Sequence, residues 1–215
     1  MKESGQFHLE ILSKISDVTA PEWNGLLTED SGPFLKHEFL SSLEETGCVG
    51  NNTGWQIAHL VLKLDKAIVG AIPLYLKQHS YGEYVFDWSW AQAYEQQGMN
   101  YYPKVLCAIP FTPVQGSRLL SKPGMNKELI YSKLISGLKS LVINNELSSA
   151  HILFPQKDEL GILNTQGFLL RDSVQFHWHN QGYQSFEQFL SSLTMKRRKN
   201  IRREREFVAR HNISF

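Results

Sequence analysis

A long amphipathic helix between two short apolar segments constrains the fold more than any other feature of the sequence. Within residues 126–146, apolar side chains recur at the three- and four-residue spacing of one helix face. Residues 105–109 and 150–155, on either side of this helix, are apolar and short enough to be buried strands. This alternation predicts an α/β fold. The apolar residues of the helix face are Leu129, Ile130, Leu134, Leu138 and Leu141.

The rest of the chain extends the alternation in both directions. Residues 55–77 predict a hairpin of two strands joined at Leu64-Asp65-Lys66, and Pro21 suits the first turn of a short helix. We therefore expect a mixed sheet flanked by helices. Further strands are predicted at residues 7–15 and 167–180, and further helices at residues 33–47, 88–97 and 158–164.

Cysteine usage and hydropathy exclude several classes of protein. Cys48 and Cys107 are far apart and have no metal-ligand spacing, which argues against a disulfide scaffold or a zinc site and favours a reducing compartment. Residues 1–11 lack the apolar core of a signal peptide. The longest apolar run, residues 67–76, is about half of the ~20 residues that a membrane-spanning helix needs. The sequence predicts a cytoplasmic protein with no transmembrane segment, no metal and no bound cofactor.

Positive charge is concentrated near the end of the chain, in TMKRRKNIRREREF at residues 194–207. The net charge of the whole chain is only +1. Ser185 and Gln188 match a capping box, so we expect one helix that starts there and continues through the basic segment. The apolar stripe from Phe186 to Leu193 continues through Arg197, which predicts that Arg197 faces inward.

Three interpretations of the basic helix remain open. It is a solvated helix face, or it binds phosphate or carbonyl groups of a substrate, or it binds nucleic acid. Arginine forks suit oxyanions because they bind them through two hydrogen bonds. Nucleic acid is disfavoured because the rest of the chain is acidic and no nucleic-acid-binding motif surrounds the helix. The candidate substrate-binding residues here are Arg197, Arg198 and Arg202.

Three blocks of sequence carry a resemblance to a known family. They are residues 79–120, from HSYGEYVFDWSWAQAY to PFTPVQGSRLL, then AHILFP with GFLLRDSVQFHWHNQGYQSFEQFL, and finally KRRKNIRRERE. The chain resembles the bacterial peptidoglycan biosynthesis/recognition family of N-acyltransferases, which is similar to the Fem-type peptidyltransferases and has a tandem GNAT fold. The resemblance implies a GNAT-like domain at residues 1–172 and the start of a second one, a strand plus the basic helix, at residues 173–215. Such proteins are generally longer, so we expect a fragment.

The resemblance also implies a function. It is the transfer of an acyl or aminoacyl group to an amine, with a peptidoglycan precursor as the acceptor and acyl-CoA or aminoacyl-tRNA as the co-substrate. The amine would attack directly, with backbone N–H groups stabilising the oxyanion. The alternatives are a non-catalytic GNAT-like module that recognises a cell-wall precursor and, less favoured, a nucleic-acid-binding protein in which tRNA is the possible partner.

Candidate site residues lie mainly in two segments of the first block. Asp87 either caps the helix after it or orients an amine at the rim of a cleft. Prolines in YYPK and IPFTPVQG stiffen the backbone, as in a pocket wall, and the pKa of Lys104 falls if it is desolvated. His177 and His179 share one side of a predicted strand, without a third metal ligand, and His177 is a candidate general base. The substrate-binding candidates here are Tyr102, Lys104, Thr112 and Arg118.

The loop before the long helix is where the resemblance places an acyl-CoA pyrophosphate. Residues 113–126, PVQGSRLLSKPGMN, depart from the usual Gln/Arg-x-x-Gly-x-Gly/Ala pattern of that loop. Gly116 and Gly124 make it flexible, and Arg118 and Lys122 are the residues able to meet phosphate. Because the match is poor, we expect the acyl-donor site elsewhere.

Overall fold

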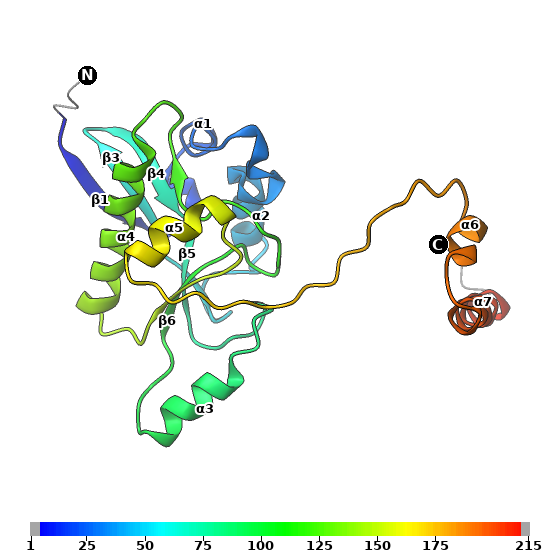
Figure 1. Ribbon diagram of the computed structural model, residues 1–215. Helices are drawn as coiled ribbons and strands as arrows, with labels where there is room; N and C mark the ends of the chain where they lie inside the picture. The colour runs from blue at the N-terminus through cyan, green and yellow to red at the C-terminus, as the bar shows by residue number, and fades with distance from the viewer. Residues whose placement is uncertain (1–4, 212–215) are drawn as a thin grey trace. The chain divides into compact units, whose positions relative to one another are not determined.

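The computed structural model describes residues 5–211 and divides into two compact units, with the boundary between Leu170 and Arg171. The first unit contains the sheets and five of the helices, and the second contains two helices (Figure 1). The predicted α/β class, with mixed β-structure flanked by helices, is confirmed. Within residues 5–211, no helix combines the length and the apolar character needed to cross a membrane.

Two four-stranded sheets form the centre of the first unit. One has the order β1-β3-β4-β7 and is antiparallel throughout. The other has the order β2-β5-β6-β8, and only its β6–β8 pair is parallel. The strands of the first sheet are β1 (Phe7–Leu12), β3 (His59–Leu64), β4 (Ala67–Ile72) and β7 (Leu120–Ser121). Those of the second are β2 (Trp55–Ile57), β5 (Leu74–Lys77), β6 (Lys104–Cys107) and β8 (Ala150–Ile152).

The predicted hairpin turns where expected but contributes to both sheets. Strands β3 and β4 pair up to Leu64 and Ala67, and Asp65 at the turn has a φ of 54°. Each of the two predicted strands is interrupted, at Ala58 and at Pro73, so that two strands become four. Pro73 has no N–H to donate to a ladder, which explains the break on that side.

Helices cover both faces of the first sheet. Alternate residues of β3 and β4 point to opposite sides, so Leu60 and Leu62 pack with α4 (Lys127–Asn144) while Val61 packs with α1 (Ala20–Asn24) and α2 (His37–Glu45). Short 3₁₀ turns lie beside α1 and α2. Of the residues predicted for the apolar face of α4, only Leu129 is exposed.

Two glycines let α4 approach the sheet closely. A Cβ added to Gly70 on β4 would lie 2.5 Å from Ile130 Cγ2. A Cβ added to Gly137 on α4 would lie 2.5 Å from Leu9 Cδ1. Both distances are far below ordinary contact distances. The spacing between this helix and the sheet therefore depends on the absence of a side chain at both positions.

Residues 78–103 form an insertion between β5 and β6. It carries α3 (Trp88–Gln96), which buries none of its residues and stands out from the sheets in Figure 1. The remaining helix of the unit, α5 (Lys157–Thr165), packs against α4 after β8. The insertion and the start of α5 matter most for the sites below.

The second unit departs from the sequence prediction in two ways. The strand predicted at residues 167–180 does not form, because none of the described residues pairs with this segment. The single predicted helix is two, α6 (Phe186–Ser191) and α7 (Met195–Arg210), with Thr194 as the N-cap of the second. The break rotates the faces of α7, so Arg197 is exposed and Arg198 is half-buried, and the predicted inward orientation of Arg197 is wrong.

Candidate functional site

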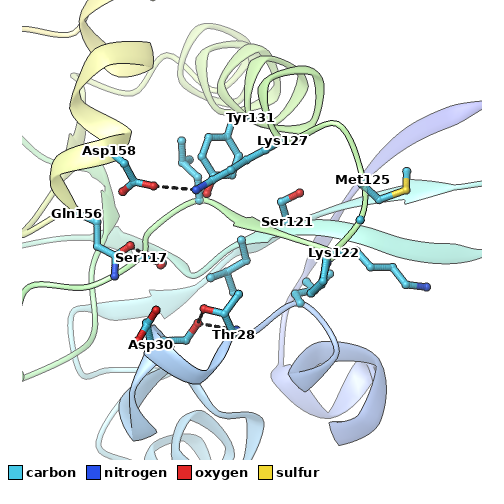
Figure 2. A pocket seen from close by; sticks show the side chains of 16 residues that line it. Thr28, Asp30, Ser117, Ser121, Lys122, Met125, Lys127, Tyr131, Gln156 and Asp158 are labelled. Atoms are coloured by element: carbon cyan, nitrogen blue, oxygen red, sulfur yellow. Dashed lines mark hydrogen bonds and ion pairs between the residues drawn. The ribbon is translucent and has the colours of Figure 1, made fainter.

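A pocket of about 540 Å³ opens where β7 ends and where α4 and α5 begin (Figure 2). Lys127 and Asp158 line it and form an ion pair, with 2.7 Å between Nζ and Oδ2. Both side chains are more than half exposed, so this ion pair is open to water and contributes little to stability. Hydroxyl groups of Thr28, Ser117 and Ser121 line the same pocket.

Local capping explains why two helices begin at this pocket. Asn126 Oδ1 accepts a hydrogen bond from the N–H of Leu129, which starts the 18-residue helix α4. Gln156 and Glu159 form a capping box that starts α5. The pocket lining carries two cations, Lys122 and Lys127, and two carboxylates, Asp30 and Asp158. Because these charges balance, the positive ends of the two helix dipoles make the pocket suitable for an oxyanion such as phosphate.

Tyr131 provides a buried phenol on the wall of the same pocket. The Nζ of Lys127 lies 5.2 Å from the centroid of its ring. Burial raises the pKa of Tyr131 to about 12, with the negative charge of Glu159 as the next cause. The hydroxyl therefore stays protonated at neutral pH, and it can donate a proton to a more basic group.

Buried Glu159 holds backbone N–H groups just before β7. Its Oε1 accepts hydrogen bonds from the N–H of Arg118 at 2.8 Å and of Leu119 at 2.7 Å. Its Oε2 accepts from the N–H of Gln156 at 2.9 Å. Burial nevertheless outweighs these bonds and raises the pKa of Glu159. The carboxylate thus occupies two adjacent amides that would otherwise be free to bind a carbonyl oxygen.

Arg118 lies inside the protein rather than on a pocket surface. Its guanidinium is fully buried and donates to the carbonyl oxygens of Leu153 at 2.7 Å, Val114 at 2.6 Å and Ser117 at 3.1 Å. Burial lowers the pKa of Arg118. A substrate contact by this predicted residue would require these bonds to break.

A second polar cluster lies at the far end of the other sheet, where β6 begins. The ammonium of Lys104 is buried and contacts Asp87 Oδ2 at 2.6 Å, Glu83 Oε2 at 2.9 Å and Ser80 Oγ at 3.1 Å. Tyr101 donates its hydroxyl to the same Asp87 oxygen at 2.7 Å. The other carboxylate oxygens, Glu83 Oε1 and Asp87 Oδ1, have no hydrogen-bond partner among the described residues.

The pKa values of the two carboxyl groups in this cluster are shifted in opposite directions. Burial raises the pKa of Glu83 more than the neighbouring Lys104 lowers it. Burial also acts to raise the pKa of Asp87, but hydrogen bonds from Lys104 and Tyr101 outweigh it and hold that pKa below its usual value. Asp87 is thus the permanent negative partner of Lys104.

A second buried lysine, Lys77, lies opposite Lys104 in the β5–β6 register. Its ammonium is 3.6 Å from the centroid of the Trp55 ring and donates to the carbonyl oxygen of Tyr81 at 3.2 Å. Burial lowers the pKa of Lys77 to about 7, against the opposing attraction of Glu83. The cluster therefore changes its charge near neutral pH.

The structure brings together three of the predicted site residues. Asp87 and Lys104 form the ion pair just described, and the hydroxyl of Tyr102 lies 2.7 Å from Ser80 Oγ beside it. Thr112 lies apart and donates to the carbonyl oxygen of Pro110.

The other candidates belong to the second unit. The exposed rings of His177 and His179 are stacked, with centroids 6.3 Å apart. Arg202 forms an exposed ion pair with Glu187. Within residues 5–211, no group of three or more His, Cys, Asp or Glu side chains is arranged to hold a metal ion. A role for His177, Arg197, Arg198 or Arg202 in substrate binding stays a prediction.

Sequence reasoning named the loop of residues 113–126 and its Lys122, which line the open pocket, but it missed the residues that the two helices contribute. Lys127, Tyr131 and Asp158 come from two helices whose starting points meet only in the folded chain. Their signal was Asn126 and the Gln156–Glu159 pair, two cap motifs that each follow a predicted strand. Lys77 and Glu83 were missed because one sequence does not reveal burial.

Comparison with known proteins gives a family and a set of similar backbones. The FemAB-like family model, described as peptidoglycan biosynthesis/recognition, matches residues 14–215. Among curated proteins, none matches the sequence.

Solved structures with a similar backbone include three acetyltransferases. Aminoglycoside N-acetyltransferase AAC(6')-Iy in complex with CoA has a TM-score of 0.49 and 11% identity, covering 83% of this chain and 98% of that chain. A ribosomal-protein-alanine N-acetyltransferase from Brucella melitensis biovar Abortus 2308 has a TM-score of 0.48 and 14% identity, covering 81% of this chain and 99% of that chain. A Trypanosoma brucei acetyltransferase has a TM-score of 0.46 and 15% identity, covering 81% of this chain and 100% of that chain. At these scores, nothing about binding or activity follows for this chain.

Proposed function

Because this chain belongs to the FemAB-like family of peptidoglycan biosynthesis or recognition, we propose that it takes part in transferring an acyl or aminoacyl group to an amine of a peptidoglycan precursor. The observation that carries this proposal is the pocket at the start of α4. Two helix N-termini, Lys127 and five hydroxyl-bearing side chains converge there on an open volume of about 540 Å³.

The pocket suits a phosphate-bearing acyl carrier such as an acyl-CoA. A phosphate at the N-terminal end of α4 would gain from the helix dipole and from the ammonium of Lys127. It would take the place of Asp158 as the partner of Lys127, leaving that carboxylate free. The loop does not carry the usual motif, so the contacts come from Lys127 and the helix starts rather than from a glycine-rich turn.

The transfer step needs no residue beside Lys127. The lone pair of the amine attacks the acyl carbonyl carbon, the carbon–sulfur bond of the thioester breaks, the sulfur leaves as a thiolate, and the amine proton passes to solvent. Tyr131 lies at the phosphate end of the carrier, where its phenol, kept protonated by a pKa of about 12, can donate a hydrogen bond to a phosphate oxygen.

Titration calorimetry with acetyl-CoA tests this proposal. The Lys127→Ala variant should bind acetyl-CoA about tenfold more weakly, the effect of losing one charge-assisted hydrogen bond. Lys133→Ala is the matched control, because Lys133 is on the same helix and also lies over an aromatic ring, that of Phe7. Equal loss in both variants, or no binding by the unmodified chain, would rule out this donor pocket.

Recognition without catalysis is the second candidate, and Glu159 favours it. This carboxylate occupies the N–H groups of Arg118 and Leu119, so these amides are not free to stabilise an oxyanion. A recognition module should bind a nucleotide-linked muropeptide and ignore acetyl-CoA in the same calorimeter. Binding of both ligands would favour transfer.

A further inference from the structure

The insertion carries a second pocket, of about 400 Å³, between α3 and the segment that returns to β6. We propose that this pocket binds a neutral sugar ring with free hydroxyl groups. The proposal goes beyond the transfer reaction above and does not depend on it. The side chains that carry the proposal are those of Trp88, Gln92, Glu95, Met99, Asn100 and Tyr102.

The pocket is fixed in place by the buried ion pairs beneath it. Asp87 at the start of α3 is held by Lys104, and Tyr101 after α3 donates to the same carboxylate. Tyr102 is fixed by its hydrogen bond with Ser80. The segment from Asp87 to Tyr102, which contains the helix, is therefore held at both ends, so a ligand would not have to order the pocket when it binds.

The charges of the insertion exclude an anionic ligand. Residues 78–103 contain no Lys or Arg. Glu83 and Asp87 are buried, so the one charged side chain that the insertion exposes is Glu95. A phosphate or carboxylate ligand would find no cation in the pocket and would be repelled by Glu95.

The pocket gives a cationic ligand little to bind. The ammonium of Lys104 lies 5.0 Å from the ring centroid of Tyr101 and 5.7 Å from that of Tyr102, so these rings already have a cation beside them. The one exposed carboxylate is that of Glu95, and a single exposed ion pair contributes little. A neutral ligand that uses the other polar groups of the lining therefore fits better than a cation.

The polar lining selects a ligand with many hydroxyl groups. The amides of Gln92 and Asn100 each donate and accept hydrogen bonds, and the Glu95 carboxylate accepts them. A wholly apolar ligand would leave these groups unpaired. The weakly positive C–H groups on one face of a pyranose suit the negative faces of Trp88 and Tyr102. Aromatic rings beside amides and one carboxylate thus match a sugar.

Calorimetric titration with the β-1,4-linked trimer of N-acetylglucosamine tests the proposal on the full chain. Trp88 and Trp90 are 48% and 45% exposed on the same helix, and only Trp88 lines the pocket. We expect saturable binding that is insensitive to salt. Trp88→Ala should weaken it at least tenfold, whereas Trp90→Ala should stay within twofold of the unmodified chain. Circular dichroism checks that both variants are folded.

Asn100→Ala provides a second variant that leaves the aromatic rings intact, and it should weaken trimer binding about fivefold. The proposal is overturned if the unmodified chain does not bind the trimer, if both tryptophan variants lose binding equally, or if an uncharged tripeptide displaces the sugar. Trp88→Ala should bind acetyl-CoA as the unmodified chain does, since it lies outside the pocket at α4. Failure of the sugar site is therefore distinguishable from failure of the donor pocket.

Discussion

Lys104 is the residue on which the attachment of the insertion depends. Two carboxylates from the insertion, Glu83 and Asp87, reach its ammonium inside the protein, where each has one oxygen without a hydrogen-bond partner among the described residues. Burying such a group is favourable only while the opposite charges remain together. Removing the lysine leaves two buried carboxylates with no cation in contact.

Lys104→Met should therefore lower the free energy of unfolding by about 3–5 kcal/mol, as expected for breaking a buried ion pair. Urea denaturation followed by circular dichroism measures the change. Lys36→Met removes an exposed lysine and should change stability by less than about 0.5 kcal/mol. A similarly small effect at Lys104 would mean that the insertion is held by other contacts.

Lys77 should make stability rise with pH just above neutrality. The unfolded chain keeps this proton up to the ordinary pKa of 10.5, whereas the folded chain releases it at about 7. The unfolded state therefore binds more protons between these values, and the free energy of unfolding gains up to about 1.4 kcal/mol per pH unit from this residue. Lys77→Met should remove that slope.

The midpoints of urea denaturation, measured between pH 7 and 8.5, compare the unmodified chain with the Lys77→Met variant. The range stops there because the raised pKa values of buried Cys107 and Tyr131 give the opposite slope at higher pH. Parallel profiles for the unmodified chain and Lys77→Met would show that Lys77 stays charged in the folded state.

At the scale of elements, the packing of α4 depends on two glycines that no helix or strand propensity would select. Gly137 lies in the middle of the helix, where glycine costs about 1 kcal/mol relative to alanine. Glycine is favoured there by the packing against the sheet, because a methyl group at this position would lie 2.5 Å from Leu9 Cδ1.

Gly137→Ala should lower the melting temperature although alanine is the better helix former. Gly161→Ala is the matched control, since Gly161 lies in α5 with no atom within 4 Å of an added Cβ, and it should be neutral or stabilising by up to about 1 kcal/mol. Differential scanning calorimetry of the two variants should give changes of opposite sign. A higher melting temperature for both would mean that Leu9 moves aside at little cost.

The elements that could be predicted from sequence were those with strong local signals. The helix from residue 127 has a clear apolar face and an asparagine cap, and the hairpin at Asp65 lies between two apolar runs. The break between β4 and β5 had a sequence signal in Pro73, whereas the break at Ala58 could not be foreseen, because it depends on which neighbour each half pairs with. The strand predicted at residues 167–180 failed for the same reason, since alternation alone does not supply a partner.

The candidate site residues, too, were predictable only where a local sequence signal places them. Asp87, Tyr102 and Lys104 were predicted from short motifs and lie together, because they flank one insertion. Arg118 was expected at a phosphate and instead donates to three carbonyl oxygens inside the protein. Whether a charged side chain points outward or inward depends on partners distant in sequence, such as Leu153, and no local pattern reveals them.

At the scale of the whole molecule, the chain consists of two units that meet between Leu170 and Arg171. Residues 171–184 are exposed or half-buried and contain neither helix nor strand. The first unit has its own core, built from both sheets, α4 and α5. It should therefore fold without the second unit.

Limited trypsin digestion should cut after Arg171 and leave a stable fragment that contains the first unit. Mass spectrometry identifies the end of the fragment, and calorimetry of the purified piece should give the melting temperature of that unit in the full chain. Degradation beyond Arg171 without a stable product would indicate that the two units stabilise each other. The prediction of a second GNAT-like domain starting at residue 173 would then need a different boundary.

No side chain of α3 is fully buried, and the helix is held by Asp87 just before it and by Tyr101 in the segment that follows it. Natural selection can therefore exchange the exposed amino acids here with little effect on the stability of the scaffold, whereas Tyr94 packs against Tyr101. The arrangement is comparable to the hypervariable loops of an antibody, in which a constant framework supports a changing surface. Descendants of one ancestral chain could acquire different ligands here, and a library randomised at Gln92, Glu95 and Asn100 should yield mostly folded proteins.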